Sequence, residues 1–231
     1  MNERTKTIIQ ELELAEHPIA ELVVSMIMKN PFWTVRYAEA EKFIRSDIAH
    51  TFEHAKTAIQ LEKPIILEEF SIWIRRLLVN RGICTFLLED YYQQLWKVCN
   101  RFLNPYLPEL EPMHQACERG LAYKQPINQY LFAQRDHLLD KIAAFAAPPP
   151  DITHDILRFE TTCYLSYLMD AVEFDKQEVF IDHAVWMAKH ADASQIPIDF
   201  HPVIFRAILK TVESEPAAAK HHVLLQEFLQ R

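Results

Sequence analysis

The sequence contains only two glycines among its 231 residues. Sheet proteins need glycine for tight hairpin turns and for left-handed backbone positions, so this composition argues against a fold rich in strands. It also argues against Rossmann and P-loop nucleotide sites, because both use clustered glycines to bring backbone N–H groups onto a phosphate. We therefore expect an all-α protein.

Cysteine and long apolar runs are also scarce. The four cysteines, Cys84, Cys99, Cys117 and Cys163, are far apart and form no C-x-x-C pair. This spacing favours reduced thiols over a disulfide or zinc framework. No run reaches the roughly 18 apolar residues of a membrane span, and the polar start over residues 1–6 lacks the apolar core of a secretory signal. We expect a cytoplasmic protein without a membrane span.

Positive charge is the third feature in short supply. The formal net charge is −8, and the lysines and arginines are scattered rather than clustered. Such a surface is unsuited to tracking phosphates on nucleic acid or to binding anionic lipid. Half of the residues are hydrophobic, as in ordinary folded domains. We expect a protein partner or self-association, or a small hydrophobic ligand, and no nucleic acid.

Proline and polar caps divide the chain into predicted helices. A short first helix is predicted to end at His17–Pro18, and a second to run from Ile19 to Lys29. The further predicted helices cover 34–61, 64–80, 86–103, 114–121, 127–146, 151–174, 176–191, 202–212 and 216–231. Three prolines within 104–112 favour a linker, since proline removes backbone donors and restricts the preceding residue. The linker predicts two helical units, 1–107 and 108–231.

The chain also contains an internal repeat. Residues 49–83 align with residues 162–196 without a gap, at the offset of 113 residues that separates Trp73 from Trp186. Glu62 then matches Asp175 just before a predicted helix start, and the apolar phase is shared. The repeat favours two similar units, globin-like or bundle-like, related by internal duplication. The two tryptophans are predicted to lie in the core, whereas positions that differ are free to carry function.

One predicted helix carries a polar face that could bind a metal. Asp47, His50 and His54 follow at spacings of three and four, with Glu53 beside them. Two imidazoles and a carboxylate on one face are metal-ligand chemistry. Carboxylate-bridged di-iron bundles need Glu-x-x-His, which this chain lacks, and a solvated helix face explains the same residues. We assign no metal site, and keep a metal- or cofactor-dependent helical-bundle enzyme as the alternative function.

The repeat points to candidate binding positions. His183 lies one turn before Trp186, and a histidine beside a tryptophan on an inward face can stack on a flat cofactor or serve as a hydrogen-bonded core residue. The repeat also aligns two histidines with different residues in the second half, which marks places where the halves differ. The candidate ligand-binding residues are His50, His54, Trp73, Cys163, Tyr167, His183 and Trp186.

The segment from Tyr164 to Phe180, continuing through Trp186 to Gln195-Ile196-Pro197, resembles phycobiliprotein-type, globin-like subunits. In that family an L-x-Y…Y-A…G-D segment leads to a helix that ends near an L-G-x-P turn. The resemblance implies a helical fold related to sensor globins, whose relatives hold a flat tetrapyrrole or a fatty acid, or serve as regulatory modules. Family members attach a bilin to a cysteine about two turns before this segment. This chain has Leu157 there, so covalent bilin attachment is not expected.

Catalytic motifs are missing from the sequence. Neither G-x-S-x-G nor H-E-x-x-H occurs, and no cysteine has a neighbouring base. An enzyme is therefore the less favoured reading. Our first hypothesis is a non-enzymatic, ligand-sensing or protein-interaction module with a regulatory role, whose candidate ligands are a tetrapyrrole or a fatty acid.

Overall fold

The computed structural model describes residues 2–37, 39–176, 178–189 and 196–215. All regular structure in these ranges is helical, as predicted. The α-helices are α1 (Glu3–Ile27), α2 (Pro31–Arg36), α3 (Ala40–Leu61), α4 (Ile65–Val79), α5 (Thr85–Phe102), α6 (Leu107–Leu121), α7 (Pro126–Ala133), α8 (Arg135–Ala146), α9 (His154–Glu173), α10 (Glu178–Lys189) and α11 (His201–Glu213). The helix predicted for 216–231 lies outside the described residues.

Side-chain caps define several helix starts. The Asn2 side chain accepts from the N–H of Thr5 at the start of α1, and Asn30 accepts from Phe32 at the start of α2. Thr153 accepts from Ile156 in the same way at the start of α9. Each cap satisfies one backbone donor that has no partner within its helix. After the C-terminal end of α4, Gly82 has φ 83°, the left-handed backbone typical of a glycine that follows a helix.

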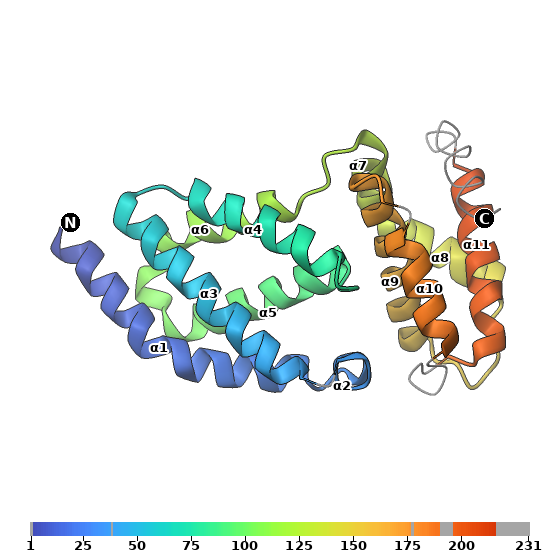
Figure 1. Cartoon of the computed structure of the whole chain (residues 1–231), viewed down its shortest axis with the longest axis horizontal. Helices are drawn as coiled ribbons and strands as arrows, with labels where there is room; N and C mark the ends of the chain where they lie inside the picture. Colours follow the sequence, from blue (N-terminus) through green and yellow to red (C-terminus); the bar gives the residue numbers. More distant parts are fainter. Residues whose placement is uncertain (1, 38, 177, 190–195, 216–231) are drawn as a thin grey trace. The chain divides into compact units, whose positions relative to one another are not determined.

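The first helix does not end at His17–Pro18, so that prediction was wrong. Helix α1 continues through Pro18 to Ile27. Residues on both sides of the proline, such as Leu12 and Ile19, are buried, and α1 packs along α3 (Figure 1). The carbonyl that loses its helical donor belongs to Leu14, which is 74% exposed and can be hydrated. Burial on both sides therefore outweighs one lost hydrogen bond.

The segment predicted as a linker is also helical. Residues Asn104–Tyr106 form a 3₁₀ turn (η1), and α6 follows directly. Pro108 lies in the first turn of α6, where no backbone donor is needed, and Pro112 lies further along the same helix. Arg4 of α1 donates to Glu109 and to the carbonyl of Pro105, which ties this segment to the first helix. Three prolines in this segment do not make it a linker.

The described chain forms two compact units, each considered by itself. The first comprises Met1–Leu78 and Leu87–Ala122, and the second comprises Val79–Phe86 and Tyr123–Arg231. The units therefore divide after Ala122 rather than after residue 107, and the turn that precedes α5 belongs with the second unit. This assignment matters because that turn covers part of α9.

In the first unit, α1 and α3 lie side by side (Figure 1) and are joined by Arg45 of α3, which pairs with Glu21 of α1. Helix α6 packs on α3 and on α4. Arg119 of α6 pairs with Glu68 of α4 at 2.8 Å, and the absent side chain of Gly120 lets the two backbones approach closely. These contacts enclose a core between five helices.

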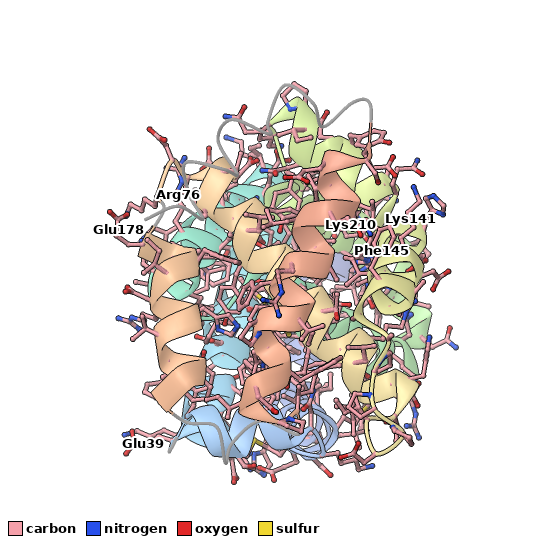
Figure 2. The ribbon with its side chains drawn as sticks, turned by 90° about the vertical axis from the view of Figure 1, so that its right-hand side faces the viewer. Glu39, Arg76, Lys141, Phe145, Glu178 and Lys210 are labelled. Atoms are coloured by element: carbon pink, nitrogen blue, oxygen red, sulfur yellow. The ribbon has the colours of Figure 1, made fainter. Side chains whose placement is uncertain are left out.

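In the second unit, α9 is the central helix. Its residues from Glu160 to Ala171 are all buried, and it packs against α7, α8 and α10. Helix α11 packs against α8, where the Lys210 ammonium lies 4.4 Å from the centre of the Phe145 ring (Figure 2). The predicted single helix over 127–146 is divided at Gln134 into α7 and α8. The breaker predicted at the three consecutive prolines after residue 147 does separate α8 from α9.

Two turns in the different units share one unusual geometry. Glu62 after α3 has φ 55° and Asp175 after α9 has φ 52°, and both residues are separated by the offset of the sequence repeat. After each, a lysine N–H donates back to an alanine carbonyl, Lys63 to Ala58 at 2.8 Å and Lys176 to Ala171 at 2.9 Å. This hydrogen bond is typical of a Schellman helix end.

Candidate functional site

The structure places the seven predicted site residues in two groups, one in each unit. His50, His54 and Trp73 belong to the first unit, on α3 and α4. The His54 ring stacks on Phe70 with ring centres 4.0 Å apart, and Phe70 in turn lies 6.1 Å from Trp73. His50 is exposed and Trp73 is 58% exposed. The prediction that Trp73 belongs to the core was therefore wrong.

The polar face of α3 has a structural explanation. Nδ1 of His54 hydrogen bonds to the carbonyl of His50 at 2.7 Å, and Glu53 pairs with Lys56. Among the residues that the structure describes, no group of three or more His, Cys, Asp or Glu side chains is arranged to hold a metal ion. The geometry thus gives no support to a metal centre on this face.

The second group surrounds α9 in the second unit. Cys163, Tyr167 and His183 are buried, and Trp186 is half-buried. The Tyr167 and His183 rings stack with centres 3.7 Å apart. The Tyr167 hydroxyl donates to the carbonyl of Gly82, in the turn before α5. These rings therefore pack against protein on several sides, and His183 is buried within the second unit.

A second histidine that the sequence analysis missed lies in the same cluster. The Tyr164 hydroxyl and Nδ1 of His201 are hydrogen bonded at 2.6 Å, and the Tyr164 ring also contacts His183 edge to face. Burial lowers the pKa of His201, because desolvation disfavours the charged imidazolium. The sequence carried no signal for this pair, because the two residues are 37 positions apart and no repeat links them.

Two further positions at which the repeats differ follow from how each helix is covered. On α9, Asp170 accepts from the N–H of Thr85 at 2.7 Å and also from its hydroxyl, and Ser166 accepts from the N–H of Phe86. These carboxylate and hydroxyl groups cap the start of α5. The corresponding residues of α3, Glu53 and Thr57, are exposed. Ser166 and Asp170 of α9 therefore hold the turn before α5 in place, whereas the same face of α3 is exposed to solvent.

An apolar cavity, which the sequence analysis did not predict, lies within the first unit. Its volume is about 70 Å³, and helices α1, α3, α4, α5 and α6 all contribute to its wall. The lining residues are Leu12, Thr51, Phe52, Ala55, Leu67, Tyr92, Leu95, Trp96, Cys99, Leu103, Leu110, Met113, His114 and Cys117. None of the seven predicted site residues lines it. Helical periodicity marks these positions as core but cannot show where five inward faces leave a space.

The wall of the cavity contains no Asp, Glu, Lys or Arg side chain. Burial raises the pKa of the Cys99 thiol to about 12 and that of the Cys117 thiol to about 11, so both are protonated at neutral pH. Burial also raises the pKa of the Tyr92 phenol well above its ordinary value. The thiols are therefore poor nucleophiles.

The opening of the cavity lies where its lining is least buried. Ala55, Trp96 and His114 are half-buried, whereas the other lining residues are buried. The Trp96 and His114 rings stack almost in parallel, with centres 4.4 Å apart and planes tilted by 6°. This pair joins α5 to α6 at the edge of the cavity.

No known protein family, curated protein or solved structure matches the chain at a significant level. None of the helices in the described ranges has the length and apolar character needed to cross a membrane.

Proposed function

We propose that this protein is a non-enzymatic binding module that takes up a small hydrophobic ligand in the cavity of its first unit. The observation that carries the proposal is the cavity itself, walled by five helices and lined almost entirely by apolar side chains. Concave, mostly apolar sites with a few polar groups are the usual form of small-molecule binding sites. Well-packed cores leave few voids of this size, because each void costs contacts and stability.

The size of the cavity narrows the choice among the candidate ligands. Pockets that enclose drug-sized ligands measure roughly 300–1,000 Å³, whereas this cavity measures about 70 Å³. That volume favours a small molecule over a tetrapyrrole or a whole fatty acid. The resemblance to phycobiliprotein-type, globin-like subunits stays a prediction about the fold and does not enter this argument.

We also propose that the two units arose by internal duplication, with α3–α4–α5 corresponding to α9–α10–α11. Three observations support this. The helix ends at Glu62 and Asp175 share one backbone geometry, the stacked rings of His54 and Phe70 correspond to those of Tyr167 and His183, and α5 and η3 begin at corresponding residues. Because only the first unit contributes to the cavity, the copies would have diverged in use.

Binding can be tested by thermal unfolding against a panel of small compounds. A ligand that binds only the folded state raises the unfolding midpoint, by an amount that grows with its concentration. The panel would include xenon, short alkanes, single-ring hydrocarbons and fatty acids, and native mass spectrometry would look for ligands retained from expression. The proposal predicts a raised midpoint with at least one apolar compound.

The matched control is a variant that obstructs the cavity. Ala55→Leu adds bulk at the opening, whereas Thr57→Leu adds similar bulk on the exposed side of the same helix. The ligand-dependent shift should disappear in the first variant and persist in the second. If no compound changes the midpoint and no retained ligand is found, the proposal is rejected. The protein-interaction half of the hypothesis is supported by scattered exposed side chains such as Trp73 and Leu14. The cavity is the more specific observation, so we advance the ligand half.

A further inference from the structure

We infer that the cavity encloses an uncharged ligand no larger than a short branched alkyl chain, and rejects acids and amines of about the same size. This inference rests on the proposed function, because it concerns the chemistry of the same cavity. It adds a class of ligand that the proposed function leaves open.

The first argument is the absence of any countercharge in the wall. Among the lining residues, all of which the structure describes, none is Asp, Glu, Lys or Arg, and His114 is the one imidazole. A carboxylate or ammonium that entered would lose its hydration without gaining an ion pair, which is strongly unfavourable. The thiols cannot serve as anions, because burial raises the pKa of Cys99 and Cys117 well above neutral pH.

The second argument is that the few polar lining groups already have partners or favour apolar contact. The Thr51 hydroxyl donates to the carbonyl of Asp47 at 2.8 Å, which is the helix bond that keeps a buried threonine satisfied. The thioether of Met113 and the two thiols are soft and weakly polar, and sulfur of this kind packs well against hydrocarbon. Away from Tyr92, Trp96 and His114, the wall therefore offers dispersion contacts rather than specific hydrogen bonds.

The third argument is size. An engineered cavity of about 150 Å³ lined by apolar side chains stays dry and binds benzene or xenon. The present cavity has about 70 Å³, roughly half of that volume. A xenon atom or an isobutyl-sized group suits this space, and a larger ligand would place the remainder at the opening beside Trp96 and His114.

The test compares compounds that share a branched alkyl group and differ in charge. Isobutane, isobutyrate and isobutylammonium would be titrated into the full chain, with xenon as a spherical apolar probe. Binding would be followed through the ¹³C-methyl signal of Met113, which lines the cavity, and through the chemical shift of ¹²⁹Xe. We expect saturable shifts with xenon and isobutane, and at least tenfold weaker binding of both charged compounds.

The outcomes separate this inference from the proposed function. If isobutyrate or isobutylammonium binds as tightly as isobutane and the signal of Met113 reports it, the inference about charge is overturned while the binding function stands. If neither xenon nor isobutane perturbs the signal of Met113, the inference about charge and the proposed binding function are both overturned. Ala55→Leu should abolish the xenon and isobutane shifts, and Thr57→Leu should leave them unchanged, so that shifts surviving Ala55→Leu would place the binding elsewhere and contradict the assignment.

Discussion

His54 and Phe70 stack ring on ring, with centres 4.0 Å apart and planes tilted by 21°, and so join α3 to α4. The corresponding rings of the second unit, Tyr167 and His183, stack at 3.7 Å and 18°. The histidine lies on α3 in the first pair and on α10 in the second, and both pairs stack. A pair of stacked flat rings at this helix crossing is therefore common to both units, whereas the residue types that form the pair differ.

Removing one ring from each pair should have unequal effects. Tyr167 is fully buried and His54 is half-buried, so we expect Tyr167→Ala to cost about 3–5 kcal/mol of unfolding free energy and His54→Ala about 1 kcal/mol. Urea unfolding followed by circular dichroism measures both. Should Tyr167→Ala not fold, Tyr167→Phe removes only the hydrogen bond to Gly82 and should cost about 1 kcal/mol. Equal losses for the two alanine variants would contradict the difference in burial.

Gly120 should not tolerate a side chain. A Cβ atom at this position of α6 would lie 2.6 Å from the Cβ of Ser71 and 2.7 Å from the carbonyl oxygen of Glu68. We expect Gly120→Ala to destabilise the fold by about 1–3 kcal/mol, although alanine is the better helix former. Adding Ser71→Gly should recover only part of the loss, because the Glu68 contact is with backbone. A stabilised Gly120→Ala variant in thermal unfolding would show that α4 and α6 are further apart.

The buried carboxylate of Asp170 should contribute more to the unfolding free energy than a carboxylate on the surface does. It is fully buried and accepts from both the N–H and the hydroxyl of Thr85. Hydrogen bonds to a charged acceptor contribute about 1.5–3 kcal/mol, so Asp170→Ala should lower the unfolding free energy by about that amount or more. Thr85→Ala removes the hydroxyl alone and should cost less. A neutral effect of Asp170→Ala in denaturant unfolding would exclude its role as the cap of α5.

His201 should make the fold sensitive to acid. Its pKa lies below the ordinary 6.5 because burial disfavours the charged ring. The unfolded chain therefore binds a proton at a higher pH than the folded chain does. Stability from this residue is complete above about pH 6.5, and it is lost as pH falls through the lower folded pKa.

The measurement is the unfolding free energy at pH 7.5, 6 and 5, for the natural chain and for His201→Gln. The variant loses the bond to Tyr164 at every pH, so its stability is lower throughout. Its decline between pH 7.5 and 5 should nevertheless be shallower. Parallel pH profiles would show that His201 does not titrate with folding.

The cysteine thiols should be silent in the native protein. All four are buried, and burial raises the pKa of Cys99 and Cys117. With a thiol-reactive dye at pH 8, we expect fewer than one equivalent to react in buffer and four equivalents in concentrated urea. Rapid reaction of the native protein would show that the cavity opens far enough to admit the dye.

Much of the helical architecture follows from the sequence, and the errors have physical causes. The scarcity of glycine and the spacing of apolar residues predict α4, α9 and α11 within a few residues. Helix α3 begins only at Ala40, and residue 34, the predicted start, lies in α2. The prolines mislead, because Pro18 and Pro112 lie where burial of the remaining helix outweighs one missing hydrogen bond. Rules based on local sequence include the hydrogen bond that a proline removes. They do not include the tertiary packing that compensates for this loss.

The candidate sites were predicted less well. Tyr167 and His183 do meet, but they lie packed in a core. Trp73, matched in both halves, is exposed, since its neighbour Phe70 fills the inward position on α4. The cavity escaped altogether, because a void is a property of five helices at once and no single stretch of sequence encodes it.

Glu62 and Asp175 both hold a left-handed backbone, which most residues other than glycine avoid. If the two units descend from one ancestor, the acid at this turn is older than the copying event. In that case neither copy acquired a glycine at this turn after the duplication. The ancestor, on this view, was already a glycine-poor helical protein before it doubled.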